Sequence, residues 1–447
     1  MEALPSQPAT GKGTPFWKTP TAWLREKKLN RGFWIFFTAA FFFDFGFAIY
    51  VFLFNLYLLD LHLNERVMGL IGGSMTLGSV VGTLPAGLLV RKYGIRPVMI
   101  LCFIGSTVLC ALRVLVLKES AQLILAFLSG LAMCLWGVCF LPALARLTTE
   151  ENRASAFSLI FSVSIGTATL GGVVCGYLQQ WLKSAGLVLQ PVEVKRIILL
   201  SSCGIAAMGL AAVVRLEMPP ILQQDQTQQN HLRKRWMPHP FLLRYLPAMA
   251  LWTAVIAAFT PFANVYLSKN LHVPMSHIGL IFSVAQVVQF CVGLLTPLLF
   301  RRLGMVPGIV VTQIATAVSL GCLAAAHNSR VAIVLYLCFS ALQWMSAPGL
   351  YNLLMTVVPD EERSTAASAA LFCNAVVASG ATAGAGILFA RFGYPYVLTG
   401  IAAMAFVVAM LFWLLVGSAK GGLPLREESA PGSGGQQSPK ETAEVGG

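Results

Sequence analysis

Asp44 is the residue in this chain best suited to chemistry, because it is the only acidic side chain inside any of its long apolar runs. It follows Phe41, Phe42 and Phe43 near the middle of the first run. An ionised carboxylate in hydrocarbon costs about 2.5–3.5 kcal/mol, and desolvation therefore favours the protonated acid. A group that is neutral when occluded and charged when wet suits a proton coupler or the counter-ion of a cationic substrate. The alternative is an acid that only ties its helix to a neighbour by a hydrogen bond.

A polar stripe extends from Asp44. At helical spacing Asp44 and Asn55 share one helix face, and an internal repeat aligns Asn55 with Asn264 and Asp44 with Thr253. Two equivalent helices would then carry one polar face each, which transport by alternating access around a central site requires.

Further polar and aromatic side chains stand within apolar runs. Because amides in lipid need hydrogen-bond partners, we expect them to face the protein interior. The predicted substrate-binding residues are Asn55, Trp136, Thr253, Asn264, Gln286, Gln289, Gln343, Trp344 and Asn374. Any single amide can instead be a helix-packing contact, and Trp136 can be apolar packing. Arg113 is expected to extend outward to the membrane surface, with a substrate anion in the interior as the alternative; the many Phe of the first run are expected to face lipid.

The elements that position these residues follow from composition. Hydrophobic residues make up 57% of the chain and charged residues 11%, against about 25% charged in soluble domains; mean hydropathy is +0.73. Apolar runs of spanning length occupy twelve ranges: 33–58, 67–90, 98–117, 122–145, 155–181, 197–216, 242–267, 277–300, 307–326, 331–355, 365–390 and 394–416. The chain is therefore predicted to be an all-α membrane protein.

The predicted organisation is two halves of six helices. An N-terminal tail (1–31) precedes the first bundle (32–216), a linker (217–240) joins it to the second (241–417), and a disordered tail (418–447) follows. With the N-terminus inside, 22 of the 31 Lys and Arg residues fall on the inner side. This bias predicts cytoplasmic termini and linker in a multi-pass protein of the cell (inner) membrane. It also explains the net charge of +13 without nucleic acid.

One loop occurs twice. Gly87 to Pro97 contains Arg91, Lys92 and Gly94, and it returns 210 residues later as Pro297 to Pro307 with Arg301, Arg302 and Gly304. A basic pair stops a span at the water interface, the Gly permits a tight turn, and the Pro can open the next helix. Gly69 maps onto Gly279 and Gly176 onto Gly386 at the same offset, which indicates an internal duplication.

These features resemble the major facilitator superfamily of secondary transporters over residues 32–417. The family loop reads Gly-x-Leu-x-Asp-Arg-x-Gly-Arg-Lys; Gly87, Leu89, Lys92 and Gly94 match it, but Arg91 replaces the acid. The resemblance implies two pseudo-symmetric bundles whose first and seventh helices line a central cavity. Two motifs of proton-coupled drug antiporters, an Arg in the fourth helix and a Gly-Pro in the fifth, are missing, which disfavours drug efflux.

In the family the loop acid helps to close the cytoplasmic side. Here the loops are basic, so acids after the fourth and tenth spans are predicted to pair with them in one conformer; ordinary exposed charge is the alternative. The predicted gating residues are Gly87, Arg91, Lys92, Gly94, Glu151, Arg153, Arg301, Arg302, Glu361 and Arg363.

The predicted function is secondary active transport of a small organic solute by alternating access, coupled to protons through Asp44. No phosphate-binding Gly-x-x-x-x-Gly-Lys-Ser/Thr sequence is present, and no metal, cofactor or catalytic set is expected, so the chain is predicted not to be an enzyme. The cavity favours a neutral or cationic solute. A monomer in the lipid bilayer is expected. Alternatives are a uniporter, a drug/proton efflux pump, and a membrane receptor or scaffold without transport.

Overall fold

The computed structural model describes residues 29–184, 190–218, 240–359 and 362–417. All regular elements in these ranges are helices, and twelve segments are long and apolar enough to cross a membrane. The prediction of an all-α protein with twelve spans is confirmed. Most of the predicted tails and linker, and Glu361, lie outside the described residues.

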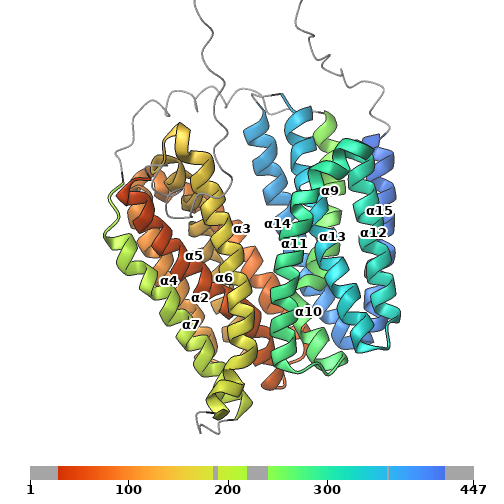
Figure 1. Ribbon diagram of the computed structural model, residues 1–447, viewed down its shortest axis with the longest axis horizontal. Coiled ribbons are helices and arrows are strands. Elements are labelled where there is room, and N and C mark those ends of the chain that lie inside the picture. The colour runs from red at the N-terminus through yellow and green to blue at the C-terminus, as the bar shows by residue number, and fades with distance from the viewer. Residues whose placement is uncertain (1–28, 185–189, 219–239, 360–361, 418–447) are drawn as a thin grey trace, which may run out of the picture.

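Each half supplies six spans (Figure 1). The first half consists of α2 (Arg31–Asp60), α3 (Glu65–Tyr93), α4 (Ile95–Leu115), α5 (Glu119–Arg146), α6 (Glu150–Ser184) and α7 (Pro191–Val214). The second half consists of α9 (Pro240–Phe259) with its continuation η2 (Thr260–Phe262), α10 (Ala263–Val265) and η3 (Tyr266–Asn270), then α11 (Met275–Leu303), α12 (Met305–Ala325), α13 (Ser329–Val357), α14 (Arg363–Phe392) and α15 (Tyr394–Phe412) with η4 (Trp413–Gly417).

The repeated loop makes the same turn in both halves. Gly94 ends α3 with φ of 85° and Gly304 ends α11 with φ of 84°, a backbone region that only glycine enters without strain. The predicted tight turns are confirmed. Pro97 and Pro307 each stand third in the following helix, where the amide N–H would still lack a helical partner.

The phenylalanines of α2 correct one expectation. Six of them are less than a tenth exposed and form part of the core: Phe33, Phe36, Phe43, Phe47, Phe52 and Phe54. They do not face lipid, because α2 is surrounded by other helices and packs against both α6 and α7. Because the run is apolar on all sides, its sequence does not indicate which face packs against other helices.

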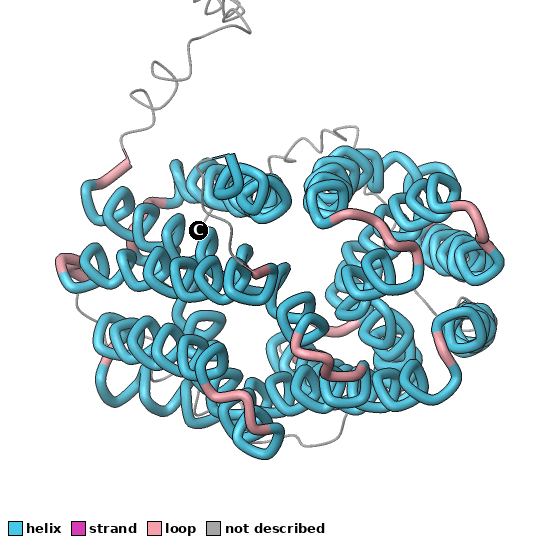
Figure 2. Tube along the Cα trace, turned by 90° about the horizontal axis from the view of Figure 1, so that it is seen from below, coloured by secondary structure: helices cyan, strands magenta, loops and turns pink. Residues whose placement is uncertain are grey.

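The two halves are separate groups of helices when seen end-on (Figure 2). They meet toward the end of the molecule where α2 ends and α11 begins, and they diverge toward the opposite end (Figure 1). The main contacts between them are α3 with α14 and α6 with α11. We call the first end the closed end and the other the open end.

Glycines allow the closed end to form. A Cβ added to Gly69 of α3 would lie 2.8 Å from the Cα of Gly386 in α14, and one added to Gly279 of α11 would lie 2.9 Å from the Cα of Gly176 in α6. Backbones can approach this closely only where both side chains are absent. Hydroxyls add to these crossings: Ser379 donates to the Gly73 carbonyl and Ser283 to the Thr169 carbonyl, each at 2.6 Å.

The first span of the second half is broken at Pro261. Proline has no N–H to return to the carbonyl of the fourth preceding residue, and the helix passes through the short 3-10 segment η2 at this point. The carbonyl left over, that of Ala257, accepts a hydrogen bond from the Thr382 hydroxyl of α14 at 3.1 Å. A side chain from a neighbouring helix thus satisfies the polar group that the break exposes.

Candidate functional site

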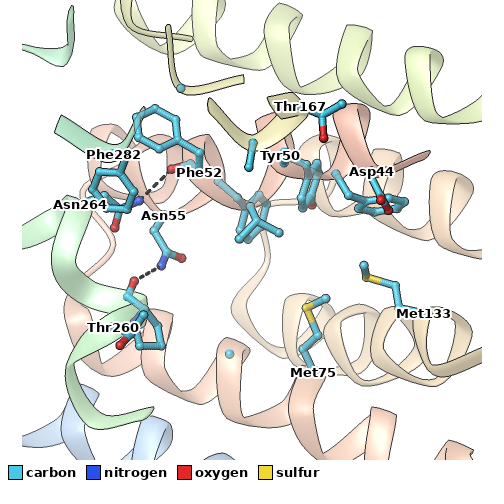
Figure 3. A pocket seen from close by; sticks show the side chains of 18 of the residues that line it. Asp44, Tyr50, Phe52, Asn55, Met75, Met133, Thr167, Thr260, Asn264 and Phe282 are labelled. Atoms are coloured by element: carbon cyan, nitrogen blue, oxygen red, sulfur yellow. Dashed lines mark hydrogen bonds between the residues drawn. The ribbon is translucent and has the colours of Figure 1, made fainter. Parts of the chain in front are cut away.

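A cavity of about 790 Å³ lies between the halves. Its walls come mainly from α2, α3 and α6 of the first half, together with Thr260, Pro261, Asn264, Phe282 and Gln286 of the second. Figure 3 shows several of these side chains, with Asp44 at one side of the view and Asn55 and Asn264 at the other. The site is mostly aromatic and aliphatic, with few polar groups, as small-molecule sites commonly are.

Asp44 lines this cavity and is held by one hydrogen bond. The Ser164 hydroxyl of α6 donates to Oδ2 of Asp44 at 2.5 Å. Trp136 of α5 also lines the cavity, and its ring lies 4.8 Å from that of Phe43 and 5.9 Å from that of Phe36. The acid therefore stands beside an aromatic cluster with a single hydroxyl to orient it.

Asn55 and Asn264 form a reciprocal pair of bonds across the halves. Nδ2 of Asn55 donates to the Pro261 carbonyl at 2.7 Å, and Nδ2 of Asn264 donates to the Phe52 carbonyl at 2.8 Å (Figure 3). Each amide binds the backbone of the helix that carries the other. The aligned residues of the repeat therefore join α2 to the broken helix and close one end of the cavity.

The structure brings only some of the predicted substrate residues together. Asp44, Asn55, Trp136, Asn264 and Gln286 line the cavity, whereas Thr253, Gln289, Gln343, Trp344 and Asn374 do not.

The residues outside the wall have other surroundings. Nε2 of Gln289 donates to the Ser340 hydroxyl at 2.5 Å, and Oε1 of Gln343 accepts from the Thr260 hydroxyl at 3.2 Å. The Thr253 hydroxyl donates to the Met249 carbonyl of its own helix. Trp344 is 54% exposed, and the buried Oδ1 of Asn374 has no hydrogen-bond partner.

Arg113 lies in the cavity wall and not at the membrane surface. Its side chain is 2% exposed, and the expectation that it extends outward is wrong. Cζ lies 4.3 Å from the centre of the Phe54 ring and 5.9 Å from that of Tyr50, while Nη1 lies 3.5 Å from Sδ of Met75. Aromatic faces attract a guanidinium, and together with this thioether they hold it inside the bundle.

An ion pair reinforces the closed end. Nζ of Lys269 in η3 lies 2.7 Å from Oε1 of Glu65, the first residue of α3. The side chain of Glu65 is 2% exposed, and that of Lys269 is 52% exposed. This contact joins the halves on the same side as the two asparagines.

The predicted gating residues lie at the open end. Arg91, Lys92, Arg301, Arg302 and Arg153 are exposed. Nζ of Lys92 lies 5.1 Å from the ring of Tyr93, and Nε of Arg363 donates to the Val358 carbonyl at 3.2 Å. Gly87 has open space around it. The side chain of Glu151, like Glu361, lies outside the described ones, so the pairing of these charges stays a prediction.

The amino-acid sequence of the chain matches a known family. The family model described as Major Facilitator Superfamily matches residues 36–382, which is more than three quarters of the chain. The chain belongs to the Major Facilitator Superfamily. It is a multi-pass membrane transporter and not an enzyme.

Solved structures of this superfamily have the same fold. The nucleoside transporter NupG superposes with a TM-score of 0.69 at 13% identity, over 86% of this chain and 99% of that one. A D-xylose-proton symporter gives 0.67 at 17% identity, over 87% and 98%. A bacterial homolog of the human lysosomal transporter Spinster, inward-facing and occupied, gives 0.66 at 14% identity, over 89% and 97%. No curated protein matches the chain in sequence.

Several residues that line the cavity could not be predicted from the sequence. Ser164, Met75, Thr167 and Thr382 line the site, but isolated hydroxyls and a methionine are common in any membrane helix and gave no signal. Arg113 did give one, since an arginine within an apolar run is rare. Because Arg113 lies near the end of a span, its side chain could extend outward to the membrane surface or inward to the cavity. Only the packing of the helices decided between these two directions.

Proposed function

We propose that this protein is a proton-coupled secondary transporter of a small organic solute, and that Asp44 is the residue that binds and releases the proton. The observation that carries the proposal is the placement of this acid on the wall of a cavity that both halves line. Its only described hydrogen-bond partner is a hydroxyl, Ser164. Without a described cation beside it, the acid can lose its proton when water enters and regain it when water leaves.

The open end is the cytoplasmic one in this proposal. It carries the basic pairs Arg91/Lys92 and Arg301/Arg302, and Lys and Arg are retained on the cytoplasmic side of membrane proteins. The cavity then faces the cytoplasm, and both termini lie there, in a monomer of the cell (inner) membrane.

The closed end works as the outer gate in this proposal. Asn55 and Asn264 bind carbonyls of the opposite half, and Lys269 binds Glu65 beside them. These contacts must separate when the halves rock to open the outer side. In that conformer the cytoplasmic ends of the two halves come together, and the acids around Glu151 and Glu361 would pair with the basic loops.

Flux through sealed proteoliposomes tests the proposal. A thermal-shift screen of metabolites at acidic and alkaline pH first selects ligands that stabilise the purified protein. We expect a selected ligand to accumulate against its gradient under an imposed pH gradient. The lumen must be more alkaline than the medium if proton and ligand move together, and more acidic if they exchange. Asp44→Asn, which fixes a neutral side chain, should abolish accumulation but retain exchange of labelled for unlabelled ligand.

The outcomes separate the alternatives. Equal flux with and without a pH gradient would identify a uniporter. Binding without any exchange would identify a receptor. Accumulation by Asp44→Asn at the wild-type level would remove Asp44 from the coupling. Thr169→Val is the matched control, because this hydroxyl on α6 bonds only within its own helix, to the Ile165 carbonyl.

A further inference from the structure

Arg113 is a buried cation that forms no ion pair with any described carboxylate. Its side chain is 2% exposed, and no described carboxylate lies within ion-pair distance of it. Among the described residues of this half, the other buried basic side chain is that of Lys195, and it has a partner, since its Nζ lies 2.6 Å from Oδ2 of Asp60. A charge that leaves water is normally paired or fully hydrogen-bonded, so Arg113 departs from the pattern that Lys195 follows.

The donors of Arg113 are incompletely used. A guanidinium carries five N–H donors. Nε is buried with no hydrogen-bond partner, and Nη1 is directed at the Met75 sulfur at 3.5 Å, which is a weak acceptor. The rings of Phe54 and Tyr50 contact the cationic face but accept no conventional hydrogen bond. The Cys110 thiol is also within hydrogen-bond reach of the guanidinium, and it too is a weak acceptor. The guanidinium therefore has hydrogen-bonding capacity left for a stronger acceptor.

The cavity is where that acceptor can arrive. Arg113 and Met75 both line it. Met75 covers Nη1 with an unbranched, flexible side chain, so a ligand can displace it by rotamer changes. Of the described residues on this wall, Arg113 is the only cation and Asp44 the only acid.

Arg113 and Asp44 stand at different levels of the cavity. Asp44 and Phe54 are ten residues apart on α2, which corresponds to about 15 Å along a helix. The guanidinium is beside Phe54 and Asp44 is not, so the two charges do not neutralise each other directly. Aromatic side chains, among them Phe47, Phe52 and Phe282, also line this cavity.

We propose that Arg113 is the anchor for the carboxylate of the transported solute, and that the solute is an organic monoanion with an apolar body. A carboxylate presents two oxygens to the guanidinium edge and forms charge-assisted hydrogen bonds with it. One guanidinium balances one negative charge, which fits a monoanion. The aromatic wall takes the apolar body. This inference rests on the proposed transport function and replaces the sequence-based preference for a neutral or cationic solute.

Matched pairs of probes test the charge requirement. Benzoate, 2-naphthoate, phenylacetate and octanoate are each compared with the corresponding neutral amide by thermal shift and titration calorimetry at neutral pH. We expect at least one carboxylate to stabilise the protein and its amide to bind at least about tenfold more weakly. If no carboxylate exceeds its amide, the proposal is overturned.

Variants assign the effect to Arg113. Arg113→Met should remove the carboxylate preference, while Arg113→Lys, which keeps the charge but loses the planar fork, should keep part of it. Arg391→Met is the matched control, because Arg391 also lies over a phenylalanine, Phe392 at 5.3 Å, but is exposed; it should leave binding unchanged. An unchanged preference in Arg113→Met overturns the proposal. Should that variant fail to fold, Arg113→Lys and the wild-type probe pairs decide.

Failure of this site and failure of the proposed function have different signatures. Carboxylate binding that depends on Arg113, with no flux into proteoliposomes, would uphold the site and refute transport. Proton-driven flux of an amide or an amine that Arg113→Met leaves unchanged would uphold transport and refute the site.

Discussion

Gly69 of α3 lies against Gly386 of α14 so closely that a Cβ on Gly69 would fall 2.8 Å from the partner Cα. The residues aligned with them in the repeat, Gly279 and Gly176, form the equivalent crossing of α11 with α6, where the corresponding distance is 2.9 Å. The duplication therefore built one contact twice, once on each side of the interface. Because this contact closes one end of the cavity, its packing affects the balance between conformers.

Enlarging these glycines should open the closed end. Gly69→Ala or Gly279→Ala inserts a methyl group into backbone contact, and such overpacking costs about 1–3 kcal/mol. Since about 1.4 kcal/mol changes a ratio tenfold, we expect more of the conformer in which this end is open. The measurement uses Thr76→Cys, a position in the cavity wall. A membrane-impermeant maleimide is added from the closed-end side, and the labelling of the native cysteines is subtracted. Gly204→Ala, which has open space around it, should change nothing.

The ion pair between Glu65 and Lys269 should respond asymmetrically to mutation. Lys269→Met leaves a carboxylate that is 2% exposed without its partner, and we expect a loss of about 1–3 kcal/mol. Glu65→Gln leaves a half-exposed lysine that water can solvate, so the loss should stay below about 1 kcal/mol. Thermal unfolding in detergent measures both. Equal losses would mean that burial of Glu65 does not control the contact.

The hydroxyl of Thr382 should matter only while Pro261 is present. Thr382→Val removes the donor to the Ala257 carbonyl, which the proline leaves unpaired, and should cost about 1–3 kcal/mol. In a Pro261→Ala background the restored N–H can bond that carbonyl, so Thr382→Val should cost clearly less. Unfolding of the four proteins gives the coupling energy, and additive losses would contradict the account. Thr399→Val is the control, because that exposed hydroxyl bonds within its own helix.

Ser164 should tune the pH dependence of transport. Its hydroxyl donates to Asp44, and a donated hydrogen bond favours the ionised carboxylate. Ser164→Ala removes this preference, so proton loss from Asp44 becomes harder. The pH profile of proton-driven flux should move to higher pH, by about one unit for a loss near 1.4 kcal/mol. A shift to lower pH, or the same shift in Thr169→Val, would contradict the assignment.

The sequence determined the features that depend on local chemistry. Apolar length fixed the twelve spans, and Gly94 and Gly304 fixed the two tight turns that follow the basic pairs. Asp44 was identifiable as the lone acid within the apolar runs because its place in such a run can be seen in the sequence itself. Each of these follows from helical hydrogen bonding, lipid burial or glycine's freedom, and none needs a partner helix.

Only the tertiary structure decided which faces meet. Rotating a helix about its axis leaves its sequence pattern unchanged but exchanges which side chains point inward. Arg113 turned into the cavity because Phe54 and Met75 of other helices receive it, while Thr253 and Trp344 lie outside the cavity wall. Asn55 and Asn264 each donate a hydrogen bond across the interface to the backbone of the helix that carries the other. Contacts between segments far apart in the chain depend on how two bundles dock, and that is settled by the packing of all twelve helices together.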